Sequence, residues 1–292
     1  MITFTQLGKH GRLGNQLFQY AAMRSISLET GHTLKIPNIH KASWQNQPCQ
    51  LTNFNIQCDS LDDREKRNIK HIYKEPDHTR FFSEVFNCPD NTDFLGFFQN
   101  YNYFSKHEKQ IREEFRINKE IEEYSKDYIS EVRKSNEEIV SVHLRRGDLI
   151  DGSCGDTYDG YYGKGKSFDK NSVFGEYLTK ALDFFSTKDV KFLVFTGGSR
   201  SGMTHNQSDI NWCKENLKDY NFAFCEGNTD MQDFTIMKSC NHHISSHMTS
   251  FGYWAAFLND NPEKIVLAPK NYTVPDDGRV SRGFYPEEWK IL

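Results

Sequence analysis

The segment His143-Leu-Arg-Arg-Gly-Asp148 contains two arginines and an aspartate, directly after the apolar run 139–144. An arginine pairs with phosphate through a planar fork of N–H donors and keeps its charge at neutral pH. At the end of a buried strand, Arg145 and Arg146 are therefore predicted to form a clamp for a pyrophosphate group. Asp148 is the nearest carboxylate and a candidate general base, although it could equally be an ion-pair partner of Arg146.

A glycine-rich segment near the amino terminus is the second candidate, Gly11-Arg-Leu-Gly-Asn-Gln16. Gly11 and Gly14 let the backbone approach a ligand closely, and a helix beginning near Asn15 points its positive end at the same place. The spacing is not that of a dinucleotide-binding Gly-x-Gly-x-x-Gly motif. By spacing alone, a tight turn with a helix cap is an equally good interpretation.

Small hydroxyl side chains open a third segment, Thr249-Ser-Phe251. At the start of a helix such hydroxyls can cap the helix or hold a phosphate. His242, His243 and His247 precede it, but they lack a His-Glu-x-x-His arrangement and straddle the end of a predicted strand. We therefore expect no metal site, and a metallohydrolase built on these histidines remains an alternative that loss of activity with a chelator would reveal.

The carboxy-terminal half must position two of these segments, and it alternates between strand and helix patterns. Strands are predicted at 139–144, 190–195, 221–224, 243–245 and 264–268, and helices at 174–185, 209–219, 229–239 and 250–259. Such alternation predicts a parallel sheet covered on both faces, as in a Rossmann-like unit. Ligands of such sheets bind beyond the carboxyl ends of the strands, where the two arginines are expected.

The amino-terminal half begins in the same way. Strands are predicted at 2–7, 33–36 and 94–98, and helices at 15–30, 103–115 and 119–135. A polar run at 134–138 separates the halves, so the predicted domains are residues 1–136 and 137–292. Segments 151–171 and 197–208 have no apolar periodicity and are predicted either to overhang a cleft or to be solvated loops.

Composition excludes several classes of protein. Among 292 residues, 36 Lys and Arg stand against 40 Asp and Glu, and the net charge of −4 argues against a dedicated nucleic-acid binder. No stretch is apolar enough to span a membrane, and the amino terminus does not resemble a secretion signal. Seven cysteines without a Cys-x-x-Cys pair favour reduced thiols in a cytoplasm. Peripheral association with the inner face of the membrane is left open.

Five segments together resemble the motifs of the α-1,2-fucosyltransferase family, in the order in which the family has them. They are Gly11–Ala21, Gly96–Phe104, Val140–Asp148, Trp212–Leu217 and Ser250–Leu258. The resemblance implies a GT-B fold, in which two Rossmann-like α/β domains face a central cleft. It also implies GDP-β-L-fucose as the donor, inversion to an α-fucoside, and no requirement for a metal or other cofactor.

The resemblance also implies roles for particular residues. Arg145 corresponds to the arginine that holds the donor β-phosphate, and His143 to a histidine near the nucleoside. Ser250 and Phe251 correspond to residues near the diphosphate and the fucose. The Gly-Asn-Gln element, at residues 14–16, faces the cleft.

The resulting prediction is an inverting glycosyltransferase that moves L-fucose to the 2-OH of a galactoside, in an oligosaccharide or polysaccharide precursor. The predicted catalytic residues are Arg145 and Asp148; the donor-binding residues are His143, Arg146, Thr249, Ser250 and Phe251; and the cleft residues, on the acceptor side, are Gly11, Arg12, Gly14, Asn15 and Gln16. Alternatives are another linkage, another GDP-sugar donor, or a non-catalytic nucleotide-sugar-binding protein. The segment 248–253 favours the last, because it departs from the family's usual Asn-Ser-Ser-Phe-Ser-Trp.

Overall fold

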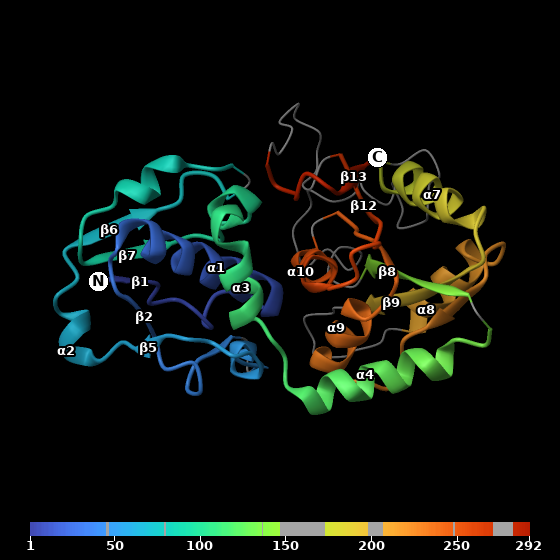
Figure 1. Ribbon diagram of the computed structural model, residues 1–292, viewed down its shortest axis with the longest axis horizontal. Helices are drawn as coiled ribbons and strands as arrows, with labels where there is room; N and C mark the ends of the chain where they lie inside the picture. Colours follow the sequence, from blue (N-terminus) through green and yellow to red (C-terminus); the bar gives the residue numbers. More distant parts are fainter. Residues whose placement is uncertain are drawn as a thin grey trace. The chain divides into compact units, whose positions relative to one another are not determined.

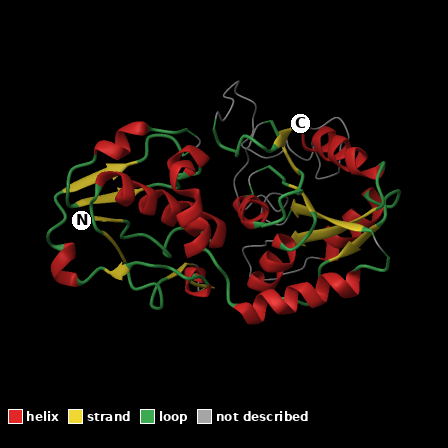
Figure 2. Cartoon of the chain, viewed as in Figure 1, coloured by secondary structure: helices red, strands yellow, loops and turns green. Residues whose placement is uncertain are grey.

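The chain forms two compact units, each with its own parallel sheet (Figures 1 and 2). The computed structural model describes residues 1–44, 47–78, 80–135, 137–146, 173–197, 207–247, 249–270 and 283–292. The first unit is Met1–Asn118 with Ser281–Glu287, and the second is Lys119–Val280 with Glu288–Leu292. The boundary predicted after residue 136 therefore lies earlier, after residue 118. The reason is that α4 (Lys119–Val132) packs against α9 (Asp230–Lys238) of the second unit.

The first unit is built on a five-stranded sheet in the order β5-β2-β1-β7-β6, and every neighbouring pair is parallel. The strands are β1 (Ile2–Thr3), β2 (Leu34–Ile36), β5 (Asp59–Ser60), β6 (His71–Lys74) and β7 (Thr92–Leu95). A small antiparallel hairpin, β3 (Ser43–Trp44) and β4 (Gln47–Pro48), stands apart from this sheet. The described helices are α1 (Leu13–Thr30), α2 (Asp63–Lys66) and α3 (Glu108–Glu114), with 3₁₀ turns η1 (Gln50–Asn53), η2 (Ser83–Asn87), η3 (Tyr101–Tyr103) and η4 (Ser105–His107).

Helix α1 is the central helix of the first unit and is buried along most of its length. Its apolar side chains include Leu17 and Phe18, neither of which is exposed to solvent. The helix ends at Gly31, which adopts a left-handed conformation (φ +73°) and donates its N–H to the Ser27 carbonyl at 2.9 Å. This glycine cap ends the helix and lets the chain turn into β2.

The second unit has a six-stranded parallel sheet in the order β10-β9-β8-β11-β12-β13. Its strands are β8 (Glu138–Arg145), β9 (Val190–Gly197), β10 (Phe222–Phe224), β11 (His242–Ile244), β12 (Val266–Ala268) and β13 (Lys290–Ile291). Besides α4 and α9, its helices are α7 (Val173–Ser186), α8 (Gln207–Asn216) and α10 (Ser250–Leu258).

The side chains of β8 alternate between the two faces of this sheet. Val140, Val142 and Leu144 are buried in one core cluster with residues of α7 and α8. His143 points to the other face, where its ring contacts residues at the start of α10. Figure 1 shows α9 and α10 on one side of β8 and β9, and α7 and α8 on the other. This alternation decides the surroundings of every residue at the end of the strand.

The predicted α/β class with two Rossmann-like units is confirmed, and the five strands predicted in the second unit are present. The first unit differs in two places. The strand predicted over 2–7 covers only Ile2–Thr3, because the chain turns at Phe4, whose carbonyl accepts the Leu7 N–H at 3.0 Å. The helix predicted over 103–115 is divided between η3, η4 and α3.

Candidate functional site

Three residues predicted to bind the donor meet where β8 ends and α10 begins. His143 Nδ1 lies 2.6 Å from the Thr249 hydroxyl. The ring of Phe251 is tilted against the His143 ring, with 5.5 Å between centroids, and packs edge-on against Phe234 of α9 at 5.2 Å. The Ser246 hydroxyl, just after β11, donates to the His143 carbonyl. His143 is therefore held from the backbone side and the ring side.

The His143 ring is neutral at physiological pH. Burial, together with the nearby positive charge of Arg145, lowers the pKa of His143 from 6.5 to about 3. Thr249 Oγ1 already accepts the Gly252 N–H at 3.2 Å. We therefore assign the hydroxyl proton to the bond with Nδ1, which leaves the ring proton of His143 on Nε2.

The first turn of α10 has the geometry of a helix that can receive an anion. Thr249 is the N-cap and Ser250 is the first helical residue. The orientation of the backbone N–H groups and the helix dipole favour negative charge at such an end. Gly252 lies close to His143, since a Cβ at this position would come within 3.0 Å of His143 Nδ1. The absence of a side chain at position 252 thus makes room for the bond between His143 and Thr249.

The two consecutive arginines lie on opposite faces of the sheet. Arg145 is half-buried and has the same strand parity as His143, so it belongs to the α10 face. Arg146 is only 4% exposed; its Nε donates to Asp209 Oδ1 at 3.0 Å, and its guanidinium lies 3.9 Å from the centre of the Trp212 ring. Both partners belong to α8. These contacts attach α8 to the end of β8, and the predicted role of Arg146 in binding the donor stays a prediction.

Some predicted features lie outside the described residues. These are Asp148, the segment 151–171, most of the segment 197–208, and Met248 of the departing motif. In the described structure Arg146 pairs with Asp209, and the ion pair between Arg146 and Asp148, considered as an alternative above, lies outside the described residues.

Two of the histidines that resembled metal ligands, His242 and His243, belong to β11, and His247 lies in the turn after it. His243 accepts the side-chain N–H of Asn259 on Nε2 at 2.7 Å and lies 2.8 Å from the Ser141 hydroxyl on Nδ1. His242 accepts the Ile265 N–H on Nδ1 and lies 3.1 Å from a Glu138 carboxylate oxygen on Nε2. All four ring nitrogens are thus engaged, and the described part of the chain holds no group of three or more potential ligands. Independence from metal remains a prediction.

In the first unit, the turn before α1 is shaped by the glycine at position 11. Gly11 has φ +92°, and a Cβ there would lie 2.6 Å from Asn15 Nδ2. The Gln16 amide is also used inside this turn: it donates to the Gly11 carbonyl at 3.0 Å and accepts the Gln50 N–H at 3.0 Å. Gln16 is 2% exposed and Gly14 is buried. Gln16 therefore joins the turn to Gln50, and the predicted contact of Gly14 and Gln16 with substrate stays a prediction.

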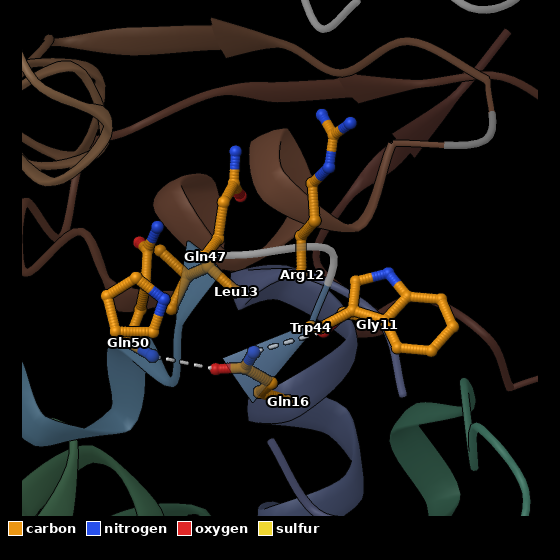
Figure 3. A pocket seen from close by; sticks show the side chains of 8 residues that line it. Gly11, Arg12, Leu13, Gln16, Trp44, Gln47 and Gln50 are labelled. Atoms are coloured by element: carbon orange, nitrogen blue, oxygen red, sulfur yellow. Dashed lines mark hydrogen bonds between the residues drawn. The ribbon is translucent and has the colours of Figure 1, made fainter. Parts of the chain in front are cut away.

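Asn15 and Arg12 remain at the surface of this turn. Both are half-buried, and Asn15 Oδ1 accepts the Gln99 amide at 2.7 Å. A shallow hollow, partly open to solvent, lies beside the turn and is lined by Gly11, Arg12, Gln16, Trp44, Gln47 and Gln50, among others (Figure 3). In Figure 3 the side chains of Arg12 and Gln47 extend away from Gln16. The first unit therefore has a shallow hollow in which an indole lies beside amide and guanidinium side chains.

Two residues that complete these arrangements were missed from the sequence. Asp209 neutralises Arg146, and a carboxylate in the first turn of a predicted helix was the available signal. Gln99 orients Asn15, and it lies in the segment Gly96–Phe104 that carried one of the family motifs.

Comparison with known proteins agrees with these observations. The sequence profile of Glycosyl transferase family 11 matches residues 2–292. The chain is 28% identical over 290 residues to an alpha-1,2-colitosyltransferase of Escherichia coli, and the alignment covers 89% of each chain. It is 27% identical over 285 residues to galactoside alpha-(1,2)-fucosyltransferase 1 of Homo sapiens, covering 91% of this chain and 68% of the relative.

Solved structures with low sequence identity share the fold. The fucosyltransferase NodZ from Bradyrhizobium superposes with a TM-score of 0.51 at 15% identity, over 87% of this chain and 90% of NodZ. A structure of POFUT1 in complex with GDP gives a TM-score of 0.50 at 15% identity, over 91% and 97% of the two chains. These likenesses confirm the GT-B type of fold, and none of the described helices is long and apolar enough to cross a membrane. The profile match over nearly the whole chain confirms the resemblance seen in the motifs: the chain belongs to glycosyl transferase family 11.

Proposed function

We propose that the protein is an inverting, metal-independent fucosyltransferase that moves L-fucose from GDP-β-L-fucose to the 2-OH of a galactoside. Membership of glycosyl transferase family 11 supports glycosyl transfer. The galactoside alpha-(1,2)-fucosyltransferases among its relatives support this donor, acceptor and linkage. The acceptor would be a galactose-containing oligosaccharide or polysaccharide precursor.

The single observation that carries the donor site is the meeting of β8 with the start of α10. A guanidinium at position 145, a neutral imidazole at position 143 and a capped helix amino terminus converge on one edge of the sheet. The guanidinium and the helix amino terminus favour an anion, and the neutral imidazole offers a hydrogen bond to a flat neighbouring group. Together they fit the chemistry of a nucleoside diphosphate.

In the proposed reaction the acceptor oxygen attacks the anomeric carbon from the face opposite the diphosphate, and the bond to the β-phosphate breaks. Arg145 stabilises the negative charge that develops on the departing GDP. The Nε2–H of His143 donates a hydrogen bond to the bound GDP-fucose, and the Phe251 ring packs beside the sugar nucleotide. Asp148 is the proposed base for the acceptor hydroxyl.

A second candidate is transfer of a different GDP-linked sugar. The Escherichia coli relative is named as a colitosyltransferase, and its identity to this chain is as high as that of the fucosyltransferases. GDP-colitose should therefore be tested beside GDP-fucose, with the ratio of the two kcat/KM values as the readout.

The test of the proposed function is the product itself. The protein is incubated with GDP-fucose and lactose in the presence of EDTA, and the product is characterised by NMR. We expect an α-linked fucose on O2 of the galactose and no dependence on EDTA. Another linkage would contradict the proposed specificity, and bound GDP without any product would point to the non-catalytic alternative.

A reducing cytoplasm is the proposed location. Six cysteines lie in the described part of the chain, at positions 49, 58, 88, 213, 225 and 240, and all six are free thiols. This agrees with a compartment in which disulfides do not persist. The measurement is fractionation of the source cells, with membrane washes to detect peripheral association.

A further inference from the structure

We propose that a row of four aromatic rings in the first unit binds the galactose ring of the acceptor; this inference rests on the proposed function. The rings follow one another in the order His78, Phe97, His10 and Trp44. Their centroids are separated by 6.0, 4.6 and 5.6 Å. His78 is exposed and the other three are half-buried. The row therefore forms a strip of aromatic surface that reaches the hollow beside α1.

The strip is assembled from separate segments that are fitted closely together. Gly8 adopts φ +74°, and a Cβ there would lie 2.8 Å from Cys49 Sγ and 2.9 Å from Ala42 Cβ. The Cys49 N–H donates to the Ala42 carbonyl at 2.9 Å and closes the base of the β3–β4 hairpin. The loop that carries His10 thus packs directly on the hairpin that carries Trp44, because glycine occupies position 8.

A buried amide joins the same loop to the segment that carries Phe97. The Gln19 side chain is fully buried, and its Nε2 donates to the carbonyls of His10 and Gly96, each at 3.1 Å. One side chain of α1 therefore sets the distance between the two segments. The His10 ring stacks on the Phe97 ring at an interplanar angle of 27° as a result.

The Phe97 segment is also held in an unusual backbone conformation. Glu75 Oε2 accepts the N–H groups of Phe97 and Phe98 at 2.7 and 2.9 Å. Phe98 has φ +53°, a left-handed value that is costly for an aromatic residue. Phe98 is fully buried, whereas Phe97 remains half-buried. Strain of this kind persists where the surroundings demand it, and here it brings Phe97 to the surface next to His10.

The chemistry of the strip fits a sugar. One face of galactose presents only C–H groups, which pack on aromatic rings, while its hydroxyls need hydrogen-bonding partners at the rim. Trp44 pairs with Gln47 across the hairpin, and both residues line the hollow together with Arg12 and Gln50 (Figure 3). Aromatic surface beside planar amides and a guanidinium is suited to such a ligand. Rings that serve only the core, such as Tyr103, are completely buried.

Tryptophan fluorescence gives a direct test that does not depend on turnover. Of the four tryptophans, Trp212, Trp254 and Trp289 are 8%, 0% and 4% exposed, so the half-buried Trp44 is the one placed to report on a surface ligand. We expect lactose to shift the emission of the wild type, and maltose to leave it unchanged. Phe97→Ala keeps this reporter and should weaken lactose binding about fivefold or more.

Steady-state kinetics complete the test. Trp44→Ala should raise the KM for lactose about fivefold or more without changing the KM for GDP-fucose, and Trp44→Phe should restore it. Tyr124→Ala, which removes a ring that is 39% exposed on α4, is the matched control and should behave as the wild type. Retained binding of GDP shows that each variant is folded.

The outcomes separate this inference from the proposed function. Transfer to lactose with a KM unchanged in both Trp44→Ala and Phe97→Ala would overturn the ring strip and leave the fucosyltransferase intact. Lactose binding that requires Phe97, in a protein that transfers no fucose, would support the strip and contradict the proposed function. If no galactoside shifts the tryptophan emission of the wild type, and none serves as an acceptor with a measurable KM, the proposed role of the ring strip is overturned.

Discussion

The ends of two strands carry the motifs of this chain, and their polar residues are used differently. At the end of β8, the half-buried His143 ring contacts the hydroxyl of the buried Thr249, and the half-buried Arg145 lies two residues further along the strand. At the turn between β1 and α1, the motif residue Gln16 is 2% exposed, and its side-chain amide forms hydrogen bonds with the backbone of Gly11 and Gln50. A polar motif residue thus contacts another side chain in one unit and the backbone of its own turn in the other.

Two residues that are adjacent in the sequence show a similar difference in surroundings. Arg145 and Arg146 differ by one position, and a strand turns successive side chains to opposite faces. One arginine therefore lies on the α10 face, while the other is buried against Asp209 and Trp212 of α8. The comparison teaches that parity along the strand, more than residue type, decides which charge is placed to meet a ligand.

The largest expected effect comes from Arg145. Arg145→Ala should lower the rate of fucosyl transfer by more than about a hundredfold, because it removes a preorganised positive charge from the departing diphosphate. Its thermal unfolding midpoint should stay near that of the wild type. The measurement is kcat with GDP-fucose and lactose, and a variant that keeps more than about a third of the rate would show that this arginine is not catalytic.

Substitution of Arg146 should lower the stability of the protein, whereas substitution of Arg145 should lower the rate of transfer. Arg146→Ala leaves the Asp209 carboxylate buried without its cation, so the free energy of unfolding should fall by about 3 kcal/mol. Lys218→Ala, an exposed cation after α8, is the control and should change stability by less than about 0.5 kcal/mol. Chemical denaturation measures both. If Arg146→Ala proved as stable as the wild type but lost GDP binding, Arg146 would belong to the donor site.

Two glycines allow the strain at the β1–α1 turn to be measured. Gly11 and Gly31 both have left-handed backbones, but a Cβ at position 11 collides with Asn15, whereas a Cβ at position 31 meets nothing within 4 Å. Gly31→Ala should cost about 1 kcal/mol from its backbone alone, and Gly11→Ala about 2 kcal/mol or more. Equal losses in denaturation experiments would mean that the turn relaxes around the new methyl group.

A further effect should appear in the dependence of stability on pH. The pKa values of His143 and His247 are lowered from 6.5 to about 3, chiefly by burial. Between about pH 3 and 6.5 the unfolded chain therefore binds more protons than the folded chain, so stability falls as pH is lowered through this range. Denaturation at about pH 7 and about pH 5 tests this. His143→Gln should make the difference smaller, and an unchanged difference would place His143 in contact with solvent.

The sequence predicts the second unit better than the first for a physical reason. Its strands and helices alternate regularly, and the apolar residues of β8 are spaced for burial against helices. In the first unit, the region between β2 and β7 contains short strands, a hairpin and 3₁₀ turns with little periodicity. The local sequence pattern carries little information about secondary structure there, because the packing of loops and of the hairpin determines the structure.

The candidate site is predictable in part. The motifs point to His143, Arg145 and Thr249, and the structure brings His143 and Thr249 into contact. The burial of Arg146 depends on Asp209, which is 63 residues away, and that of Gln16 on Gln50. Such pairings arise from tertiary structure and leave no signal in local spacing. The alternation of side chains along the predicted strand, continued to Arg146 just after β8, was however available from the sequence.

The account depends on Arg145 as the residue that holds the donor phosphate, and calorimetric titration of GDP in the presence of EDTA tests this most directly. The prediction is that the wild type binds GDP and not UDP, that Arg145→Ala abolishes GDP binding, and that Lys218→Ala binds GDP as tightly as the wild type. Unchanged affinity for GDP in folded Arg145→Ala would contradict the account.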